Sequence, residues 1–200
     1  MEKILVTYDS GYGSTAAAAD TIAETLVEKG LSVNLCPIGM EDLSGYDALF
    51  LGSPIRLGRC TPEIKRFLKK NLAALTCMPA AFFFTCMIVT NDELKQEYPL
   101  YIDPLFCGPD RPRPRIRLME NNHTASYYLK RFLKFIPGVT PCGVAFFKGC
   151  LDIKKLTPVH RLIMCFAMFS LPEITNGDFL SPVTIKSWTQ SLFRKMEMAG

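Results

Sequence analysis

The stretch ILVTYDSGYGSTAAAAD, from Ile4 to Asp20, runs from an apolar segment through two glycines into an alanine-rich segment. Residues 4–8 form a continuous β-branched and apolar run, which is typical of a parallel strand covered on both faces. From Ser14 to Lys29 the alanines, Ile22 and Leu26 recur at helical spacing. A strand, a glycine turn and a helix in this order predict a phosphate-binding loop at the start of the helix.

The rest of the chain keeps alternating strands with helices. Further strands are expected at residues 31–35, 48–53, 80–89 and 143–149, and further helices begin at Thr61-Pro62 and Ser181-Pro182. Such alternation requires right-handed crossovers and predicts an α/β fold with an open, doubly wound parallel sheet. Ligands on such sheets bind beyond the carboxyl ends of the strands, which brings the loops 9–15, 53–60 and 85–90 to one edge.

Two kinds of phosphate loop are compatible with GYGSTA at residues 11–16. It satisfies the dinucleotide fingerprint, but that motif also needs an acidic residue at the end of the second strand, where this chain has VNLCP at residues 33–37. A mononucleotide phosphate loop is favoured instead, with hydroxyl groups from Ser10, Ser14 and Thr15, backbone amides and the helix dipole as donors. A P-loop is excluded because no G-K-[ST] follows, and a glycine turn that binds nothing remains the alternative.

The composition limits the class of protein. With 200 residues, 48% of them hydrophobic and 21% charged, the chain predicts one globular domain over residues 1–200. The eight cysteines lack any C-x-x-C pair and only two histidines could join them, so no metal site is expected. The scattered cysteines indicate a reducing cytoplasm, and MEKILVTYDSG fits a first strand better than a signal peptide.

The longest apolar run, LIMCFAMFSL at residues 162–171, is about half as long as a membrane span requires. We expect a buried helix here, with a helix lying on a membrane surface or on a partner as the alternative. The neighbouring cations Lys148, Lys154, Lys155 and Arg161 favour a peripheral contact with the inner face of the membrane.

A long basic insertion, about residues 91–123, separates the strands at 80–89 and 143–149. It contains the alternating arginines Arg111, Arg113, Arg115 and Arg117. These form either a solvated loop or a site for an anionic partner: an acidic redox protein, a carboxylate-bearing substrate such as a porphyrin, or anionic lipid. Nucleic acid is not expected, because no recognised nucleic-acid module accompanies the arginines.

The motifs DSGYGST, LSGYDALFLGSPIRLGRCTPEIKRFLKKN and MPAAFFFTC resemble a flavodoxin domain. Within that family, the chain is most similar to the flavodoxin-type, quinone-dependent protoporphyrinogen dehydrogenases, and GVAFFKGCLDIKKLTPVHRLIMCFAMF extends the similarity. The resemblance covers about residues 1–90 and 124–200. It implies a five-stranded parallel sheet of order 2-1-3-4-5 with a long insertion between strands four and five.

The resemblance also implies FMN, with the phosphate on residues 10–15 and the isoalloxazine ring between the 53–59 and 85–90 loops. The candidate cofactor residues are Ser10, Gly11, Tyr12, Gly13, Ser14, Thr15, Ser53, Pro54, Ile55, Arg56, Leu57, Gly58, Thr85, Cys86 and Met87. Arg56 is expected to influence the flavin, because a nearby cation stabilises the reduced, anionic form. No catalytic acid–base pair is evident, and His123 and His160 are expected to be isolated surface or linker residues.

These observations predict an FMN-binding redox protein that transfers electrons to or from a dedicated partner. A net charge of +4 argues against a generic shuttle, since freely diffusing flavodoxins are usually acidic. One alternative is an enzyme similar to the quinone-dependent protoporphyrinogen IX dehydrogenases. Another is a non-redox binding module on a flavodoxin scaffold.

Overall fold

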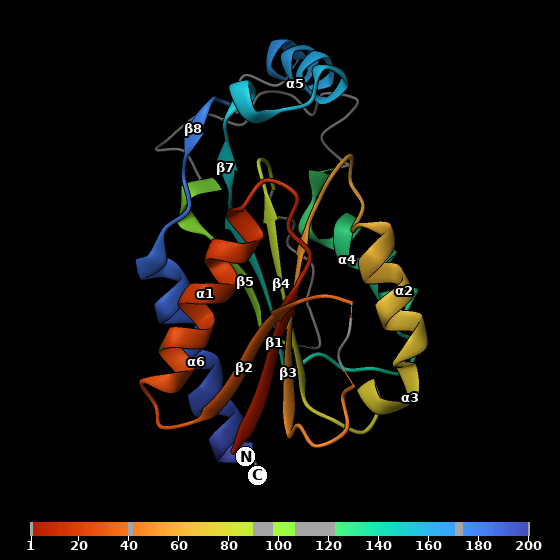
Figure 1. Cartoon of the computed structure of the whole chain (residues 1–200), viewed down its shortest axis with the longest axis vertical. Helices are drawn as coiled ribbons and strands as arrows, with labels where there is room; N and C mark the ends of the chain where they lie inside the picture. Colours follow the sequence, from red (N-terminus) through yellow and green to blue (C-terminus); the bar gives the residue numbers. More distant parts are fainter. Residues whose placement is uncertain (1, 40–41, 90–97, 107–122, 171–173, 200) are drawn as a thin grey trace.

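The computed structural model describes residues 2–39, 42–89, 98–106, 123–170 and 174–199. Its centre is a six-stranded parallel sheet of order β2-β1-β3-β4-β6-β5 (Figure 1). The strands are β1 (Lys3–Tyr8), β2 (Ser32–Pro37), β3 (Ala48–Pro54), β4 (Ala80–Cys86), β5 (Leu100–Ile102) and β6 (Gly143–Lys148). A short antiparallel pair, β7 (Cys150–Leu151) and β8 (Gly177–Asp178), lies beyond the carboxyl end of β6.

Helices cover both faces of the sheet. On one face lie α1 (Ser14–Val27) and α6 (Pro182–Ala199), and on the other α2 (Pro62–Lys70), α3 (Leu72–Leu75) and α4 (Ala125–Leu133) (Figure 1). Two 3-10 helices, η1 (Pro104–Phe106) and η3 (Ile153–Lys155), lie in connections. The remaining helix, α5 (Pro158–Ser170), covers neither face and lies past the carboxyl ends of the strands.

Two apolar clusters, one on each face, hold these layers together. Every residue of β3 and β4 is buried, because both faces of these central strands are covered. Alternate residues of β4 belong to different clusters. Phe82 and Phe84 pack on the side of α4, while Phe83 packs on the side of α1 and α6. The doubly wound α/β fold predicted from the strand and helix alternation is confirmed.

The predicted count of five strands is wrong by one. The core order is as predicted, but the three-residue strand β5 adds an edge beside β6. So short a strand carries no periodic pattern by which the sequence could reveal it. It falls inside the predicted insertion, of which residues 91–97 and 107–122, with Arg111, Arg113, Arg115 and Arg117, lie outside the described residues.

The expectation of a buried helix at residues 162–171 is also wrong. Leu162 and Phe166 of α5 are exposed, whereas Met164 and Ala167 are only partly buried, and Leu171 lies outside the described residues. An apolar run of this length predicts a helix, but the sequence does not show how many of its faces meet another element. No helix within the described ranges has the length and apolar character needed to cross a bilayer.

Gly52, near the end of β3, is packed closely against its neighbours. A Cβ at this position would lie 2.3 Å from the ring of buried Phe83 and 3.0 Å from the methyl group of Thr15. We expect Gly52→Ala to lower the free energy of unfolding by about 1–3 kcal/mol, because the packed core leaves no room for a methyl group. Urea unfolding measures this, and an unchanged midpoint would show that the neighbouring side chains shift without cost.

Candidate cofactor site

The phosphate loop, residues 10–15, connects β1 to α1. Gly13 is the N-cap of α1 and adopts a φ of 96°, a left-handed conformation that glycine tolerates best. No side chain caps the helix, and its first turn contains no acidic residue. The N–H groups of the first turn and the positive end of the helix dipole are thus available to an anion.

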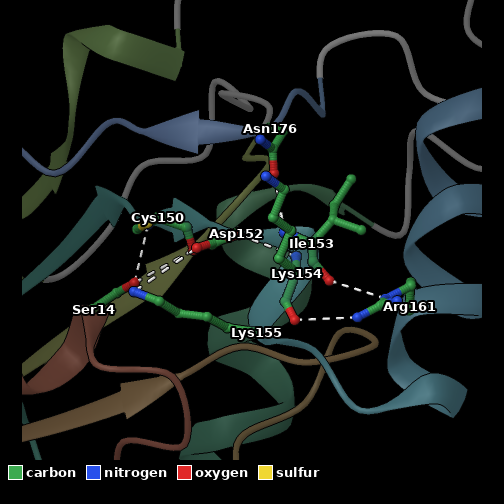
Figure 2. Close-up of polar contacts among 8 residues, drawn as sticks. All are labelled: Ser14, Cys150, Asp152, Ile153, Lys154, Lys155, Arg161 and Asn176. Atoms are coloured by element: carbon green, nitrogen blue, oxygen red, sulfur yellow. Dashed lines mark hydrogen bonds and ion pairs between the residues drawn. The ribbon is translucent and has the colours of Figure 1, made fainter.

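The hydroxyl groups of this loop, which the sequence predicts as phosphate donors, also form hydrogen bonds within the protein. Ser14 Oγ accepts a hydrogen bond of 2.9 Å from the Cys150 N–H (Figure 2), and the Thr15 and Thr85 hydroxyl groups are 2.8 Å apart. Ser10 Oγ accepts a 3.2 Å bond from the Gly13 N–H. These bonds fasten the loop to β7, to β4 and to itself. The Ser10 O–H and the backbone amides of the first turn of α1 can still donate to a phosphate.

The 53–59 loop ends in a tight turn. Arg56 and Arg59 exchange backbone hydrogen bonds of 2.9 and 3.0 Å, and the two residues between them, Leu57 and Gly58, have φ values of 48° and 72°. Positive φ at both central positions defines a type I′ turn, which usually carries Asn-Gly. Leu57 therefore occupies a strained position, with its side chain 80% exposed at the tip of the loop.

Arg56 reaches back from this turn to the phosphate loop. Its guanidinium carbon lies 4.9 Å from the centre of the Tyr12 ring. A Cβ on Gly11 would come within 2.1 Å of Arg56 Nη2, so only glycine at position 11 leaves room for this arrangement. The cation expected near the flavin ring thus lies against the phosphate loop.

The third loop follows β4. Thr85 and Cys86 are buried, and Met87 is partly buried against a small apolar cluster. Burial raises the pKa of the Cys86 thiol well above its usual range, so the thiol stays protonated and serves as an apolar wall, not a nucleophile.

The three loops enclose one cavity of about 310 Å³. All the predicted cofactor residues line it except Gly13, which caps α1, and Ser53, which is buried and donates its hydroxyl to the Pro54 carbonyl oxygen. The juxtaposition that the parallel topology predicts is therefore present in the structure.

A further wall of this cavity comes from residues that the sequence did not predict as part of the cofactor site. We call residues 150–170 the roof segment; it comprises β7, η3 and α5. Additional residues lining the cavity are Ile88, His123, Tyr128, Gly149, Cys150, Leu151, Asp152, Lys155, Leu156, His160, Ile163, Met164, Ala167 and Ile174. One indication in the sequence that this segment belongs to the site is the similarity of GCLDIKKLTPVHRLIMCFAMF to a flavoprotein family. That similarity does not show that the segment folds over the cavity.

Polar contacts hold the roof segment in place (Figure 2). The Arg161 guanidinium donates to the carbonyl oxygens of Ile153 and Lys154 at 3.2 and 3.1 Å, and the Ile153 N–H donates to Asn176 Oδ1 at 3.0 Å. The Ser14–Cys150 bond ties the same segment to the phosphate loop. The position of α5 is therefore coupled to the start of α1.

The expectation that both histidines are isolated is wrong. His160 Nδ1 lies 2.5 Å from the Tyr12 hydroxyl group, and His123 Nδ1 lies 2.8 Å from the Tyr128 hydroxyl group. Burial lowers the pKa of His123 and raises that of Tyr128, which favours a neutral pair on the cavity wall. Neither pair is visible in the sequence, because the members of one are far apart along the chain and the other depends on how α4 begins.

Comparison with known proteins identifies the class. Residues 5–173 match the model of the flavodoxin domain, so the chain belongs to the flavodoxin-domain family. A short-chain flavodoxin associated with a non-canonical PDU bacterial microcompartment superposes with a TM-score of 0.51 at 11% identity, covering 97% of this chain and 98% of that one. That likeness supports the fold.

Curated relatives are similar at low identity. The protoporphyrinogen IX dehydrogenase [quinone] of Leishmania major is 23% identical over 181 residues, which cover 88% of this chain and 64% of that protein. The NAD(P)H dehydrogenase (quinone) of Afipia carboxidovorans is 32% identical over 91 residues, covering 34% of this chain and 46% of that protein. The chain thus spans about half the length of the first curated relatives it matches.

The residues present suit FMN, the cofactor of this family. The uncapped start of α1 and the guanidinium of Arg56, which lies against Gly11, match a phosphate group. Pro54, Ile55 and Met87 supply apolar surface for a flat ring. The lining of the cavity is accordingly suited to hold FMN.

Replacing Arg56 tests the cation at the phosphate loop. We expect Arg56→Ala to weaken FMN binding at least about tenfold, because a charge-assisted hydrogen bond to the phosphate contributes about 1.5–3 kcal/mol. It should also lower the reduction potential of the flavin, which loses a cation that stabilises its reduced, anionic form. Flavin fluorescence and equilibration with redox dyes measure the two effects. Arg59→Ala, at the other end of the same turn, is the matched control, and equal effects in both variants would refute the assignment.

Replacing Leu57 tests the strain in the turn. We expect Leu57→Asn to raise the free energy of unfolding by about 1 kcal/mol, because asparagine tolerates a positive φ better than leucine does. Leu57→Ala lacks the side-chain amide that can hydrogen-bond the nearby backbone in this conformation and should give no comparable gain. Urea unfolding of the flavin-free protein measures both variants. A lower free energy of unfolding in Leu57→Asn would contradict the interpretation that Leu57 is strained.

Proposed function

We propose that this protein is an FMN-dependent oxidoreductase that exchanges electrons with a flat, apolar molecule of the quinone class bound beneath α5. One observation carries the proposal: the cavity continues from the flavin loops to the inner side of α5, where Ile163, Met164 and Ala167 line it. A carrier that serves only other proteins needs an open flavin edge, whereas an apolar roof suits a second, apolar ligand. Two of the relatives, from Afipia carboxidovorans and Leishmania major, are named as quinone dehydrogenases, which supports an acceptor of the quinone class.

In this proposal the protein positions the reactants, and bound FMN supplies the transfer of electrons or of a hydride. The phosphate loop and Arg56 would hold the phosphate, while the 53–59 and 85–90 loops would flank the ring. The His123–Tyr128 pair, on the wall of the same cavity, presents an imidazole and a hydroxyl group that can hydrogen-bond a carbonyl oxygen of the acceptor.

The electron donor in this proposal is an anionic molecule. A second cavity of about 300 Å³ shares Tyr128 with the first and is bordered by cations. These are Arg59, Lys65, Arg131 and Lys134. Such a cluster of cations would form ion pairs with carboxylates. A porphyrinogen, the class of molecule in the name of the Leishmania major relative, is therefore a suitable electron donor.

A second candidate is an electron carrier for a dedicated partner, the function that the sequence predicts, and an acidic redox protein is one partner of this kind. The same four cations support it, since a positive patch beside the flavin would steer an acidic redox protein into contact. The contribution of Arg111, Arg113, Arg115 and Arg117 to binding an anionic partner remains a prediction, because these residues lie outside the described part of the chain.

The first test is an absorption spectrum after incubation with FMN and gel filtration, followed by dithionite titration and reoxidation by a soluble naphthoquinone. We expect retained flavin and rapid reoxidation. Ala167→Trp should slow reoxidation at least about tenfold while keeping the flavin bound, because the indole would fill the space under α5. Cys165→Trp, on an exposed position of the same helix, is the control.

Other outcomes separate the alternatives. A stable one-electron-reduced flavin together with slow, Ala167-independent reoxidation would favour the carrier. A colourless protein after gel filtration would favour a binding module without redox function.

A further inference from the structure

Helix α5 carries a second apolar face that points away from the cavity. We call Val159, Leu162, Phe166 and Phe169 the outer stripe; they are 68%, 74%, 71% and 89% exposed, respectively. Their spacing of three, four and three residues places them along one side of the helix. The helix thus presents apolar side chains both to the cavity and to the outside, whereas a helix on a protein surface ordinarily carries polar residues on its outer side.

Cations lie beside the first turn of this helix. The Arg161 guanidinium is bonded to two backbone carbonyl oxygens and not to a carboxylate (Figure 2). Lys155 has an ion pair of 3.8 Å with Asp152, a loose contact between exposed groups that contributes little. Lys154, in the same short 3-10 helix, is exposed as well. The roof segment therefore retains most of its positive charge next to the outer stripe.

We propose that α5 docks the protein on an anionic phospholipid bilayer. The helix would lie in the plane of the interface, with the outer stripe at the boundary of the acyl chains and Lys154 and Arg161 among the headgroups. At 13 residues, α5 is suited to lie on the surface and too short to cross the bilayer.

The place of α5 in the fold suits a flat partner. It forms one end of the long axis of the molecule, opposite the chain termini (Figure 1). A planar surface can therefore meet the outer stripe without meeting the helices that cover the sheet.

A second copy of this chain fits the outer stripe less well than a bilayer. A symmetric contact through α5 would bring the same cations of two copies together, and like charges repel. Anionic headgroups would instead neutralise them.

Docking through α5 would place the bilayer on one side of the helix and the cofactor cavity on the other. An apolar quinone dissolved in the membrane would then have a short path to the cavity, a consequence that rests on the proposed function. The docking itself depends only on the outer stripe and the cations.

The test is co-sedimentation of the purified, FMN-loaded protein with vesicles of phosphatidylcholine alone or mixed with phosphatidylglycerol, repeated without FMN. We expect binding to the mixed vesicles, weakened by salt, and little binding to phosphatidylcholine alone. Phe166→Ser with Phe169→Ser should lower the affinity at least about tenfold, because two large apolar side chains no longer leave water. Val183→Ser removes an apolar side chain that is 77% exposed on α6 and should leave binding unchanged.

A second variant tests the charge. Lys154→Gln should weaken binding to the mixed vesicles and flatten its salt dependence. The proposal is overturned if the wild-type protein ignores the mixed vesicles, or if the Phe166 and Phe169 replacements bind as well as the wild type. It is equally overturned if sedimentation velocity shows self-association through the outer stripe in place of vesicle binding. None of these readouts requires flavin turnover, so a failure of the proposed function would be seen separately.

Discussion

Two hydroxyl groups at the start of α1 hold the site together. Ser14 accepts a hydrogen bond from the backbone of β7, and Thr15 meets Thr85 in the buried interior at the end of β4. Because these bonds join the first turn of α1 to two other segments, the helix start, the 85–90 loop and the roof segment take up one mutual arrangement. A loop held in this way can bind a phosphate through the backbone amides that the uncapped helix start leaves available and through the Ser10 hydroxyl group.

The roof segment separates this chain from a minimal flavodoxin fold, in which the helices only cover the sheet. Here α5 leaves the two layers and crosses the carboxyl edge, where ligands of parallel sheets bind. Its inner residues narrow the opening of the cofactor cavity, and its outer residues meet no other element in the described part of the chain. A helix that is apolar on both sides suits a place between a cavity and an apolar environment.

The cations discussed above fall into three groups. The cations of η3 and α5 flank the outer stripe, while those of the second cavity lie between the 59–65 segment and α4. Arg56 forms the third group by itself, against the phosphate loop at Gly11 and Tyr12. Each group matches an anion of a different kind: lipid headgroups, a carboxylate-bearing donor or an acidic partner, and the phosphate of the cofactor.

The sequence by itself determined the architecture and most of the cofactor loops. Uninterrupted apolar strands, the glycine turn before α1 and proline at the start of α2 and α6 are local signals, and the parallel topology then brings the three loops to one edge. Only the tertiary structure decided which side chains share the cavity. The His123–Tyr128 and His160–Tyr12 pairs, the return of Arg56 to Gly11 and the exposure of α5 depend on contacts between segments distant in sequence or on which helix faces stay uncovered. Hydrophobic periodicity reports that a helix has an apolar face but does not report what lies opposite that face.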